Sequence, residues 1–271
     1  MNADPYRVSG PTCISFSGGR TSGYMLAKIL AAHGGALPAD AHVIFANTGK
    51  EHPGTLDFVR DCSARWGVAI TWVEYDGRGG KLDYREVTHD SASRNGEPFA
   101  RLIEQKKALP NWQARWCTAA LKVQRARARM RSLGHEEWTD FVGLRADEPH
   151  RVAKRKAASD EDDEVTYALP LASAGVTEAD VLAWWRTQPF GLRVPYGAGN
   201  CDLCYLKGST LLRARLAADP AASAWWEAQE ASVGRTFSSR FSYAGLRAEA
   251  TAPRRQLLLF DEPTLPCACT D

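Results

Sequence analysis

The stretch Thr12–Ser22, TCISFSGGRTS, followed by GYMLAKIL over residues 23–30, decides the fold. An apolar, β-prone run ends at Phe16, and a turn rich in serine and glycine follows it. Apolar residues then recur from Tyr24 to Leu30 at close to the helical period. The stretch therefore predicts a strand, a tight turn and a helix.

The turn has the chemistry of a phosphate cradle. Gly18 and Gly19 allow the backbone to turn sharply and to approach a ligand closely. The N–H groups that open a helix, together with the helix dipole, attract an anion. Hydroxyl donors come from Ser15, Ser17, Thr21 and Ser22. The alternative is that these side chains only cap the helix. The turn matches neither the Gly-x-x-x-x-Gly-Lys-Ser/Thr loop nor Gly-x-Gly-x-x-Gly.

Further strands and helices alternate after this unit. Residues 42–46 and 68–75 are predicted strands, and a helix that starts near Pro53 and ends near Trp66 lies between them. This spacing predicts a doubly wound, mainly parallel α/β sheet. Ligands bind at the carboxyl ends of such strands, so the loop Asn47, Thr48 and Gly49 is expected beside the Ser-Gly-Gly turn. Together the two loops favour a nucleotide or phosphate site.

The rest of the chain is less regular. We expect strands at 137–142 and 166–171, and helices at 99–107, 117–133, from Thr177 onward and at 208–232. The predicted loops are 76–98, which has the composition of a lid, and the charge runs 154–156 and 160–164. Residues 233–271 look polar and irregular. We divide the chain into a nucleotide-binding domain, 1–198, and a cysteine-containing C-terminal region, 199–271, that packs on it.

Composition sets bounds on function. The 271 residues carry a net charge of +2, which indicates neither a strongly basic nucleic-acid binder nor an acidic protein. No apolar run approaches 18 residues and the first residues have no apolar targeting core, so we expect a cytoplasmic protein without a membrane span. In that compartment the seven cysteines are expected to be reduced.

The cysteine pattern favours a metal centre. Cys201 and Cys204 have a spacing that lets two thiolates reach one metal, and Cys117 stands beside Arg115, whose charge favours a thiolate. Cys267 and Cys269 are further candidate ligands. Zinc, a 4Fe-4S cluster and a redox pair all remain open. Two simpler interpretations also remain open: Cys117 is a buried helix residue, and Cys267 and Cys269 are exposed thiols.

The predicted helix after Cys117 is basic. Its cations are Lys122, Arg125, Arg127, Arg129 and Arg131. The simpler interpretation is a solvated helix. The alternative is a track for a nucleic-acid backbone, whose binding would fall steeply with salt.

Five ordered motifs resemble the phosphoadenosine phosphosulfate (PAPS) reductase family of the PP-loop superfamily. They are SFSGGRTS at 15–22, FANTGKE at 45–51, WCTAALK at 116–122, GLRADE at 143–148 and NCDLCYLKG at 200–208. The resemblance covers about residues 11–208 and implies an adenine-nucleotide α-hydrolase-like fold. It implies a phosphate-binding loop made of Ser17, Gly18, Gly19, Arg20, Thr21 and Ser22, with Asn47, Thr48 and Gly49 beside it.

The resemblance also implies chemistry. The leading hypothesis is an enzyme that binds ATP or an adenylyl nucleotide and transfers sulfur with a 4Fe-4S cluster. The cluster would be held by Cys117, Cys201, Cys204 and one of Cys267 or Cys269. Phosphates would be neutralised by Arg20, Lys122 and Arg145. In the reductase alternative below, the sulfate and phosphates would be bound by Lys122, Arg145, His150 and Arg151.

Two alternatives remain open. In a true PAPS or adenylyl-sulfate reductase, Cys267 or Cys269 attacks the sulfonucleotide and sulfite is released. The third hypothesis is a zinc-stapled module that binds nucleotide or nucleic acid. The expected partners are an adenine nucleotide and a sulfur or electron donor, such as a thioredoxin-like protein or a cysteine desulfurase. A nucleic-acid acceptor, Mg²⁺ and a homo-oligomer are further options.

The chain departs from the family pattern at three places. Thr21 stands where the ATP-cleaving pattern has aspartate, and Cys117 is single where related cluster proteins have a Cys-Cys pair. The tail reads PCACTD over residues 266–271 where family reductases have Glu-Cys-Gly-x-His.

Overall fold

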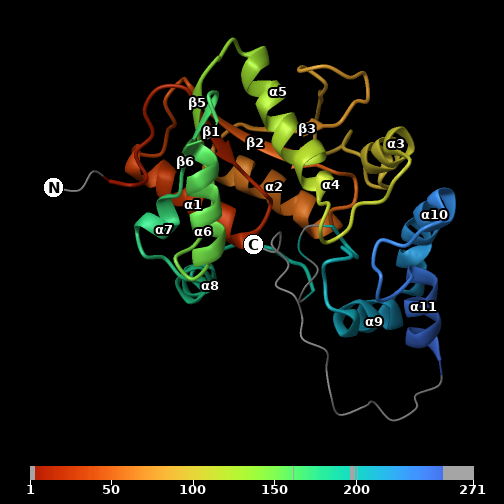
Figure 1. Cartoon of the computed structure of the whole chain (residues 1–271). Coiled ribbons are helices and arrows are strands. Elements are labelled where there is room, and N and C mark those ends of the chain that lie inside the picture. Colours follow the sequence, from red (N-terminus) through yellow and green to blue (C-terminus); the bar gives the residue numbers. More distant parts are fainter. Residues whose placement is uncertain (1–3, 161, 196–198, 200, 253–271) are drawn as a thin grey trace.

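The computed structural model of the chain describes residues 4–160, 162–195, 199 and 201–252. Six strands form one sheet in the order β4-β3-β2-β1-β5-β6 (Figure 1). β4 pairs antiparallel with β3, and every other neighbouring pair is parallel. The strands are β1 (Thr12–Ser15), β2 (Ala41–Asn47), β3 (Ile70–Glu74), β4 (Arg85–Val87), β5 (Trp138–Phe141) and β6 (Val165–Ala168). The predicted α/β class is confirmed.

Helices connect and cover the strands. The helices of the first part are α1 (Arg20–Ala32), α2 (Pro53–Trp66), α3 (Glu97–Lys106), α4 (Trp116–Thr118), the π-helical turn η1 (Ala119–Val123), α5 (Gln124–Ser132), α6 (Pro149–Asp160), α7 (Pro170–Ser173) and α8 (Glu178–Arg186). Those that follow are α9 (Ser209–Ala218), the 3₁₀ turn η2 (Pro220–Ser223), α10 (Ala224–Val233) and α11 (Tyr243–Thr251). No helix in the described part of the chain is long and apolar enough to cross a membrane.

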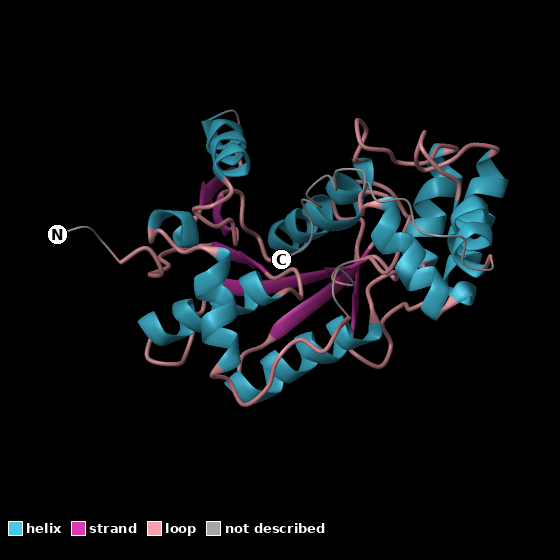
Figure 2. Cartoon of the chain, turned by 90° about the horizontal axis from the view of Figure 1, so that it is seen from below, coloured by secondary structure: helices cyan, strands magenta, loops and turns pink. Residues whose placement is uncertain are grey.

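Neighbouring residues of each strand face opposite layers, as the pleat requires. Ile14 of β1 packs in a core with Met25 of α1 and Trp185 of α8. Cys13, the residue before it, packs with Met130 of α5 on the other face. Helices therefore cover both faces of the sheet, as Figure 2 shows. A Thr177 capping box opens α8, as its sequence predicts.

A second core lies beyond the sheet. It joins Phe99 of α3 and Leu121 of η1 to buried residues of the C-terminal helices, among them Leu212, Trp226 and Tyr243. Helices α9, α10 and α11 group at this end of the molecule (Figure 1). The boundary at residues 198 and 199 stays a prediction, and residues from both sides of it share this core.

Three predicted loops contain regular structure. Residues 154–160 belong to α6, where the Arg155 guanidinium stacks 4.5 Å from the centre of the Tyr167 ring. Within 76–98, Arg85 lies in β4 and pairs with the buried Glu74 at 2.6 Å. Residues 243–251 form α11, which Ser242 caps by accepting from the Gly245 N–H. The loop predictions were therefore wrong for residues 154–160, 85–87 and 243–251, where regular structure forms in a polar segment, and they hold for most of 76–98 and for 162–164.

Candidate active site

The turn after β1 is held in one shape by its own hydroxyl groups. Ser22 Oγ accepts from the Ser17 N–H at 3.2 Å and from Ser17 Oγ at 3.1 Å, and donates to Gly19 O at 3.0 Å. Gly18 has φ +76°, and a Cβ at this position would stand 2.7 Å from Thr55 Cγ2. Helix α1 starts after Gly19, which has no side chain to cap it. The opening N–H groups therefore face the turn without a capping side chain from that position.

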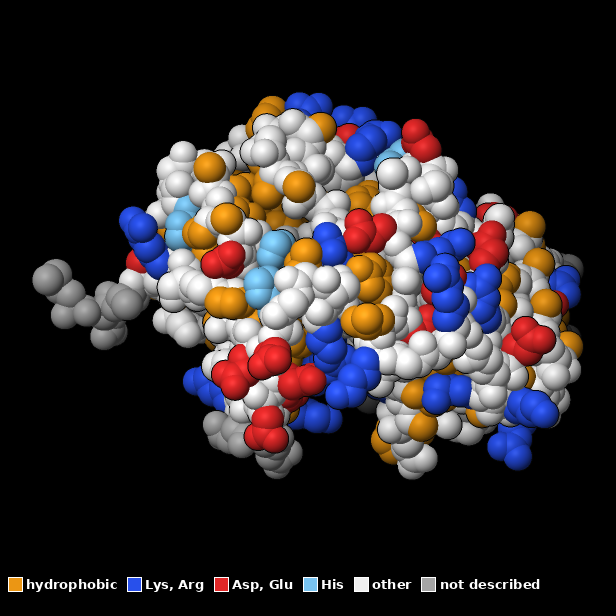
Figure 3. Space-filling view, turned by 90° about the horizontal axis from the view of Figure 1, so that it is seen from above, with side chains coloured by type: hydrophobic (Ala, Val, Ile, Leu, Met, Phe, Trp, Pro, Cys, Tyr) orange, Lys and Arg blue, Asp and Glu red, His pale blue; other side chains and the backbone are white. Residues whose placement is uncertain are grey.

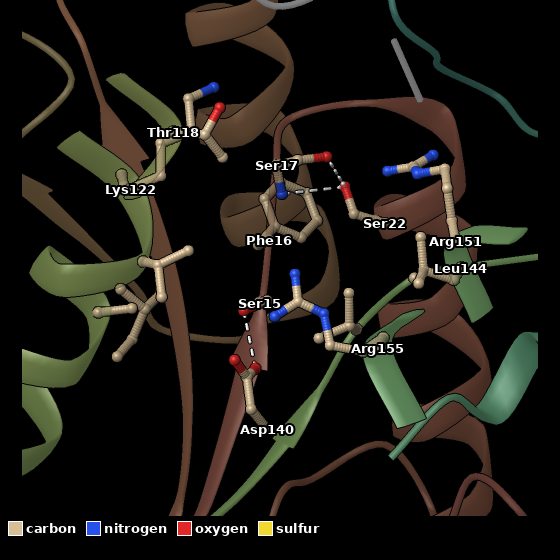
Figure 4. A pocket seen from close by; sticks show the side chains of 16 residues that line it. Ser15, Phe16, Ser17, Ser22, Thr118, Lys122, Asp140, Leu144, Arg151 and Arg155 are labelled. Carbon is tan, nitrogen blue, oxygen red and sulfur yellow. Dashed lines mark hydrogen bonds between the residues drawn. The ribbon is translucent and has the colours of Figure 1, made fainter. Parts of the chain in front are cut away.

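A cavity of about 180 Å³ opens beside this turn, at the carboxyl ends of β1, β2 and β5. The chain reverses its direction across the sheet between β1 and β5, the position where doubly wound sheets bind ligands. The lining hydroxyls belong to Ser15, Ser17, Ser22 and Thr118, and the lining cations are Lys122, Arg151 and Arg155. Figure 4 shows Lys122 and Arg151 on opposite walls, with Ser17 and Ser22 between them.

One carboxylate lies in the cavity wall. Asp140 of β5 accepts a hydrogen bond of 2.7 Å from Ser15 Oγ. Burial raises the pKa of Asp140, although Ser15, Arg155 and Arg127 act in the opposite direction. Sequence reasoning missed both Asp140 and Arg155. A carboxylate between the apolar residues Trp138 and Phe141 of a predicted strand was the one available signal.

Besides Gly18 and Gly19, three predicted phosphate-site residues lie beside the cavity rather than in its lining. Arg20 donates to Leu192 O at 2.9 Å and lines a second hollow of about 390 Å³. Thr21 accepts from Arg145 Nη1 at 3.2 Å. Arg145 is buried and pairs with Asp147 at 3.0 Å. The Arg145 contacts brace the start of α1.

The polar groups of the loop after β2 also form hydrogen bonds within the protein. Asn47 donates to Glu74 Oε1 at 2.6 Å and to Ser93 O at 2.9 Å, and accepts from the Gly49 N–H. The Thr48 N–H and hydroxyl both donate to Glu51 at 2.9 Å. Asn47, Thr48 and Gly49 therefore stand next to the site without lining the cavity.

Cys117, Cys201 and Cys204 meet in one neighbourhood at the edge of the second core. Cys117 Sγ lies 3.4 Å from the Tyr205 hydroxyl, and Cys201 Sγ lies 3.6 Å from Thr48 Oγ1. Burial raises the pKa of Cys201 to about 12, and Glu51 and Cys117 act in the same direction. Cys204 is buried.

The structure describes three of the predicted metal ligands, Cys117, Cys201 and Cys204. Within the described ranges, no three side chains of His, Cys, Asp or Glu form a group suited to a metal ion. Cys267 and Cys269, the candidates for the fourth ligand, lie outside the described residues. Three thiols supply the right type of donor for zinc or for an iron–sulfur cluster.

The cavity and the thiols are neighbours. Cys117 directly precedes Thr118, a lining residue, within the short helix α4. Lys122 lines the cavity from the π-helical turn and lies 3.5 Å from Glu51. Glu51 in turn forms an antiparallel bridge with Cys201. Interruptions of an α-helix by a π turn are frequent at functional sites.

The basic helix is not simply solvated. Arg125, Arg127, Arg129 and Arg131 pair with Asp83, Asp162, Glu86 and Glu164 respectively. Acidic and basic side chains accordingly lie next to one another on the face seen in Figure 3. The intrachain carboxylates offset much of the charge that the nucleic-acid hypothesis would use, and that hypothesis stays a prediction.

Comparisons with known proteins agree with this architecture. Residues 11–192 match the family described as the phosphoadenosine phosphosulfate reductase domain. An uncharacterized nin region protein, ORF290, of Escherichia phage lambda is 32% identical over 213 residues, 72% of this chain and 66% of the phage protein. An uncharacterized protein of Methanocaldococcus jannaschii is 25% identical over 150 residues, 55% of this chain and 26% of that protein. The match thus spans less than two thirds of either relative. By its matched domain, the chain belongs to the phosphoadenosine phosphosulfate reductase family of the PP-loop superfamily.

Proposed function

We propose that the chain binds ATP or a closely related adenylyl nucleotide in the β1–β5 cavity and uses it in sulfur transfer at the neighbouring thiols. The observation that carries the proposal is the composition of the cavity wall. Three cations and four hydroxyl groups line the cavity beside the start of α1, and Cys117 adjoins the same wall. Phosphates need this combination of donors and positive charge.

Each part of the wall has a role in the proposal. The N–H groups at the start of α1 donate to phosphate oxygens. The Ser17 and Ser22 hydroxyls, which donate within the turn, hold these N–H groups in place. Lys122 and Arg151, on opposite walls, neutralise the charge that grows on departing pyrophosphate. Activation of an acceptor oxygen by adenylation makes it a leaving group for incoming sulfur.

The thiols have a separate role. Cys117, Cys201, Cys204 and one of Cys267 or Cys269 would hold a 4Fe-4S cluster. When bound, such a cluster would supply iron for carrying or reducing sulfur. The chain's own contribution is to keep these thiols beside the nucleotide, because Thr118 and Lys122 line the cavity while Cys117 adjoins them.

Calorimetric titration with ATP, with PAPS as competitor, tests nucleotide binding. We expect micromolar to millimolar affinity for ATP, and about tenfold weaker binding in Arg151→Met, which loses one cationic partner of the phosphates. Arg60→Met is the matched control, because Arg60 is half-exposed on α2 and pairs only with Asp57 and Asp61 among the described residues. A native chain that binds neither nucleotide contradicts the proposal.

Elemental analysis of protein purified without oxygen tests the metal. We expect about four irons per chain, as a 4Fe-4S cluster requires. A Cys117→Ser variant should lose iron while it keeps ATP affinity. Zinc without iron would instead favour the zinc-stapled module.

Reduction of PAPS or adenylyl sulfate is the second candidate. It is favoured by the description of the matched family and by a wall with three cations, which suits a ligand with several anionic groups. In this reaction Cys267 or Cys269 attacks the sulfonucleotide sulfur, and a thioredoxin-like protein or glutathione releases sulfite. Sulfite release should then vanish when both cysteines are replaced by serine. An unchanged rate rules this candidate out.

A further inference from the structure

A buried glutamate joins the nucleotide cavity to the thiols. The Glu51 side chain has no exposed surface, and its partners include both Thr48 donors and the Lys122 ammonium. Burial of a carboxylate is costly unless its oxygens are paired and hydrogen-bonded, as those of Glu51 are. The contacts of Glu51 therefore restrict the positions of Thr48 and Lys122.

On the cavity side, Glu51 acts through Lys122. The Nζ–Oε1 distance of 3.5 Å is longer than the 2.7–2.9 Å of a close charge-assisted hydrogen bond. An ammonium group has three donors, so Lys122 can face Glu51 and a phosphate at the same time. The lysine stem is flexible, and a fixed carboxylate restricts where its charge lies.

On the thiol side, Glu51 acts through the backbone. It forms an antiparallel bridge with Cys201, and the adjacent Asp202 N–H donates to Lys50 O at 2.7 Å. Lys50 also pairs with the Asp202 carboxylate at 2.9 Å. The turn that carries Cys201 is thus attached to the same four-residue segment, 48–51, that directs Lys122.

We propose that Glu51 is a positioning residue that fixes Lys122 at the rim of the nucleotide cavity and ties this rim to the Cys201 turn. The inference rests on the proposed nucleotide binding and extends it to a residue outside the cavity lining. It assigns Glu51 no contact with the nucleotide. Its effect on affinity must then pass through Lys122.

A double-mutant cycle in ATP affinity tests this path. Lys122→Met should weaken ATP binding about tenfold, and Glu51→Gln about three- to fivefold, since each removes or releases the same cation. The double variant should be no weaker than Lys122→Met alone. A residue that affects ATP binding independently of Lys122 would give losses that multiply, to about thirty- to fiftyfold.

Glu74 provides the matched control. Its side chain is also without exposed surface, and it accepts from Asn47, Ser93 and Arg85 rather than from Lys122. Glu74→Gln should lower the melting temperature, and its effect on ATP affinity should multiply with that of Lys122→Met. If Glu74→Gln and Glu51→Gln show the same coupling energy with Lys122→Met in ATP affinity, the role assigned to Glu51 is wrong.

A second variant covers the case in which Glu51→Gln does not fold. Thr48→Val keeps the carboxylate and removes the hydroxyl that donates to both of its oxygens. It should weaken ATP binding a few fold, without a further loss in Lys122→Met. If the native chain binds ATP but the losses of these variants multiply with that of Lys122→Met, this inference alone is wrong. No ATP binding by the native chain overturns the proposed function and the inference together.

Discussion

The nucleotide cavity and the thiol neighbourhood are built in opposite ways. The cavity turn is local: Ser17, Gly19 and Ser22 bond to one another within six residues. The thiol neighbourhood is assembled from distant segments, since Cys117 reaches Tyr205 across 88 residues and Thr48 reaches Cys201 across 153. The first is fixed by backbone geometry, and the second depends on how the C-terminal helices pack.

This difference has an energetic consequence. Contacts between distant segments must offset the loop entropy that is lost when the segments meet. The thiol neighbourhood therefore relies on the second core for its geometry, whereas the cavity turn relies on a few special backbone angles. Substitutions in the two regions should differ in which property they affect.

The largest effect is expected in the second core. Trp226 is 1% exposed, and its Nε1 donates to Asp202 Oδ1 at 3.0 Å. Trp226→Ala should lower the free energy of unfolding by about 3–5 kcal/mol, since it leaves a large cavity and a carboxylate without this donor. Urea unfolding measures the change. Trp112→Ala, at a side chain that is 62% exposed, should change it by less than about 0.5 kcal/mol. Equal losses would contradict this comparison.

The next effect distinguishes backbone strain at a positive φ from steric overlap of an added Cβ in the cavity turn. Gly18→Ala places a Cβ 2.7 Å from Thr55 Cγ2 at a φ of +76°, whereas Gly10 has a similar φ of +65° and open space around it. Gly10→Ala should cost about 1 kcal/mol of unfolding free energy. Gly18→Ala should cost about 2–4 kcal/mol, because overpacking adds to the strain.

Calorimetry distinguishes the two variants further. ATP affinity should fall at least about tenfold in Gly18→Ala and stay unchanged in Gly10→Ala, since only the first displaces the turn. A Gly18→Ala chain that binds ATP normally would show that the turn does not need its present geometry.

The same contrast between local and distant contacts explains which elements could be predicted from the sequence. The strand–turn–helix unit and helix α2 follow local rules of periodicity and turn chemistry, and both were predicted within a few residues. Helix α6 was missed because its charge runs look solvated, while Arg155 in fact stacks on Tyr167 of β6. A three-residue edge strand such as β4 has too short a pattern to detect without its partner β3.

The candidate site shows the same limit. The hydroxyls and glycines of the turn are adjacent in sequence and were predicted together. Asp140 and Arg155 join them only because β5 pairs with β1, and the order of strands is not encoded in any one segment. Arg145 was placed in the site on its motif, while its burial beside Thr21 and Asp147 gives it a bracing contact instead.

A smaller effect concerns the charge of the cavity wall. Arg155 lines the cavity near Asp140 and Ser15 (Figure 4). Arg155→Met should weaken ATP binding by about three- to tenfold, because one positive charge near the phosphates is lost. It should also lower the salt dependence of binding. An Arg155→Lys variant that restores the affinity would identify charge as the cause, and a loss in both variants would identify the stacking on Tyr167.

The smallest effect is a pH dependence that comes from the cavity wall. Burial raises the pKa of Asp140 in the folded chain above its ordinary value of 3.8. Between the ordinary and the raised pKa, the folded state holds more protons than the unfolded state, so Asp140 makes stability fall as pH rises. Asparagine at this position cannot ionise and keeps an oxygen that accepts from Ser15.

Asp140→Asn should therefore flatten this part of the pH profile. The difference in unfolding free energy between the variant and the native chain should grow with pH through the window above 3.8, and level off once Asp140 is ionised in both states. Urea unfolding at half-unit steps from pH 4 to 8 measures it. A difference that is constant across the series would show that Asp140 titrates alike in both states, and the cavity wall would then be as well solvated as the outer surface.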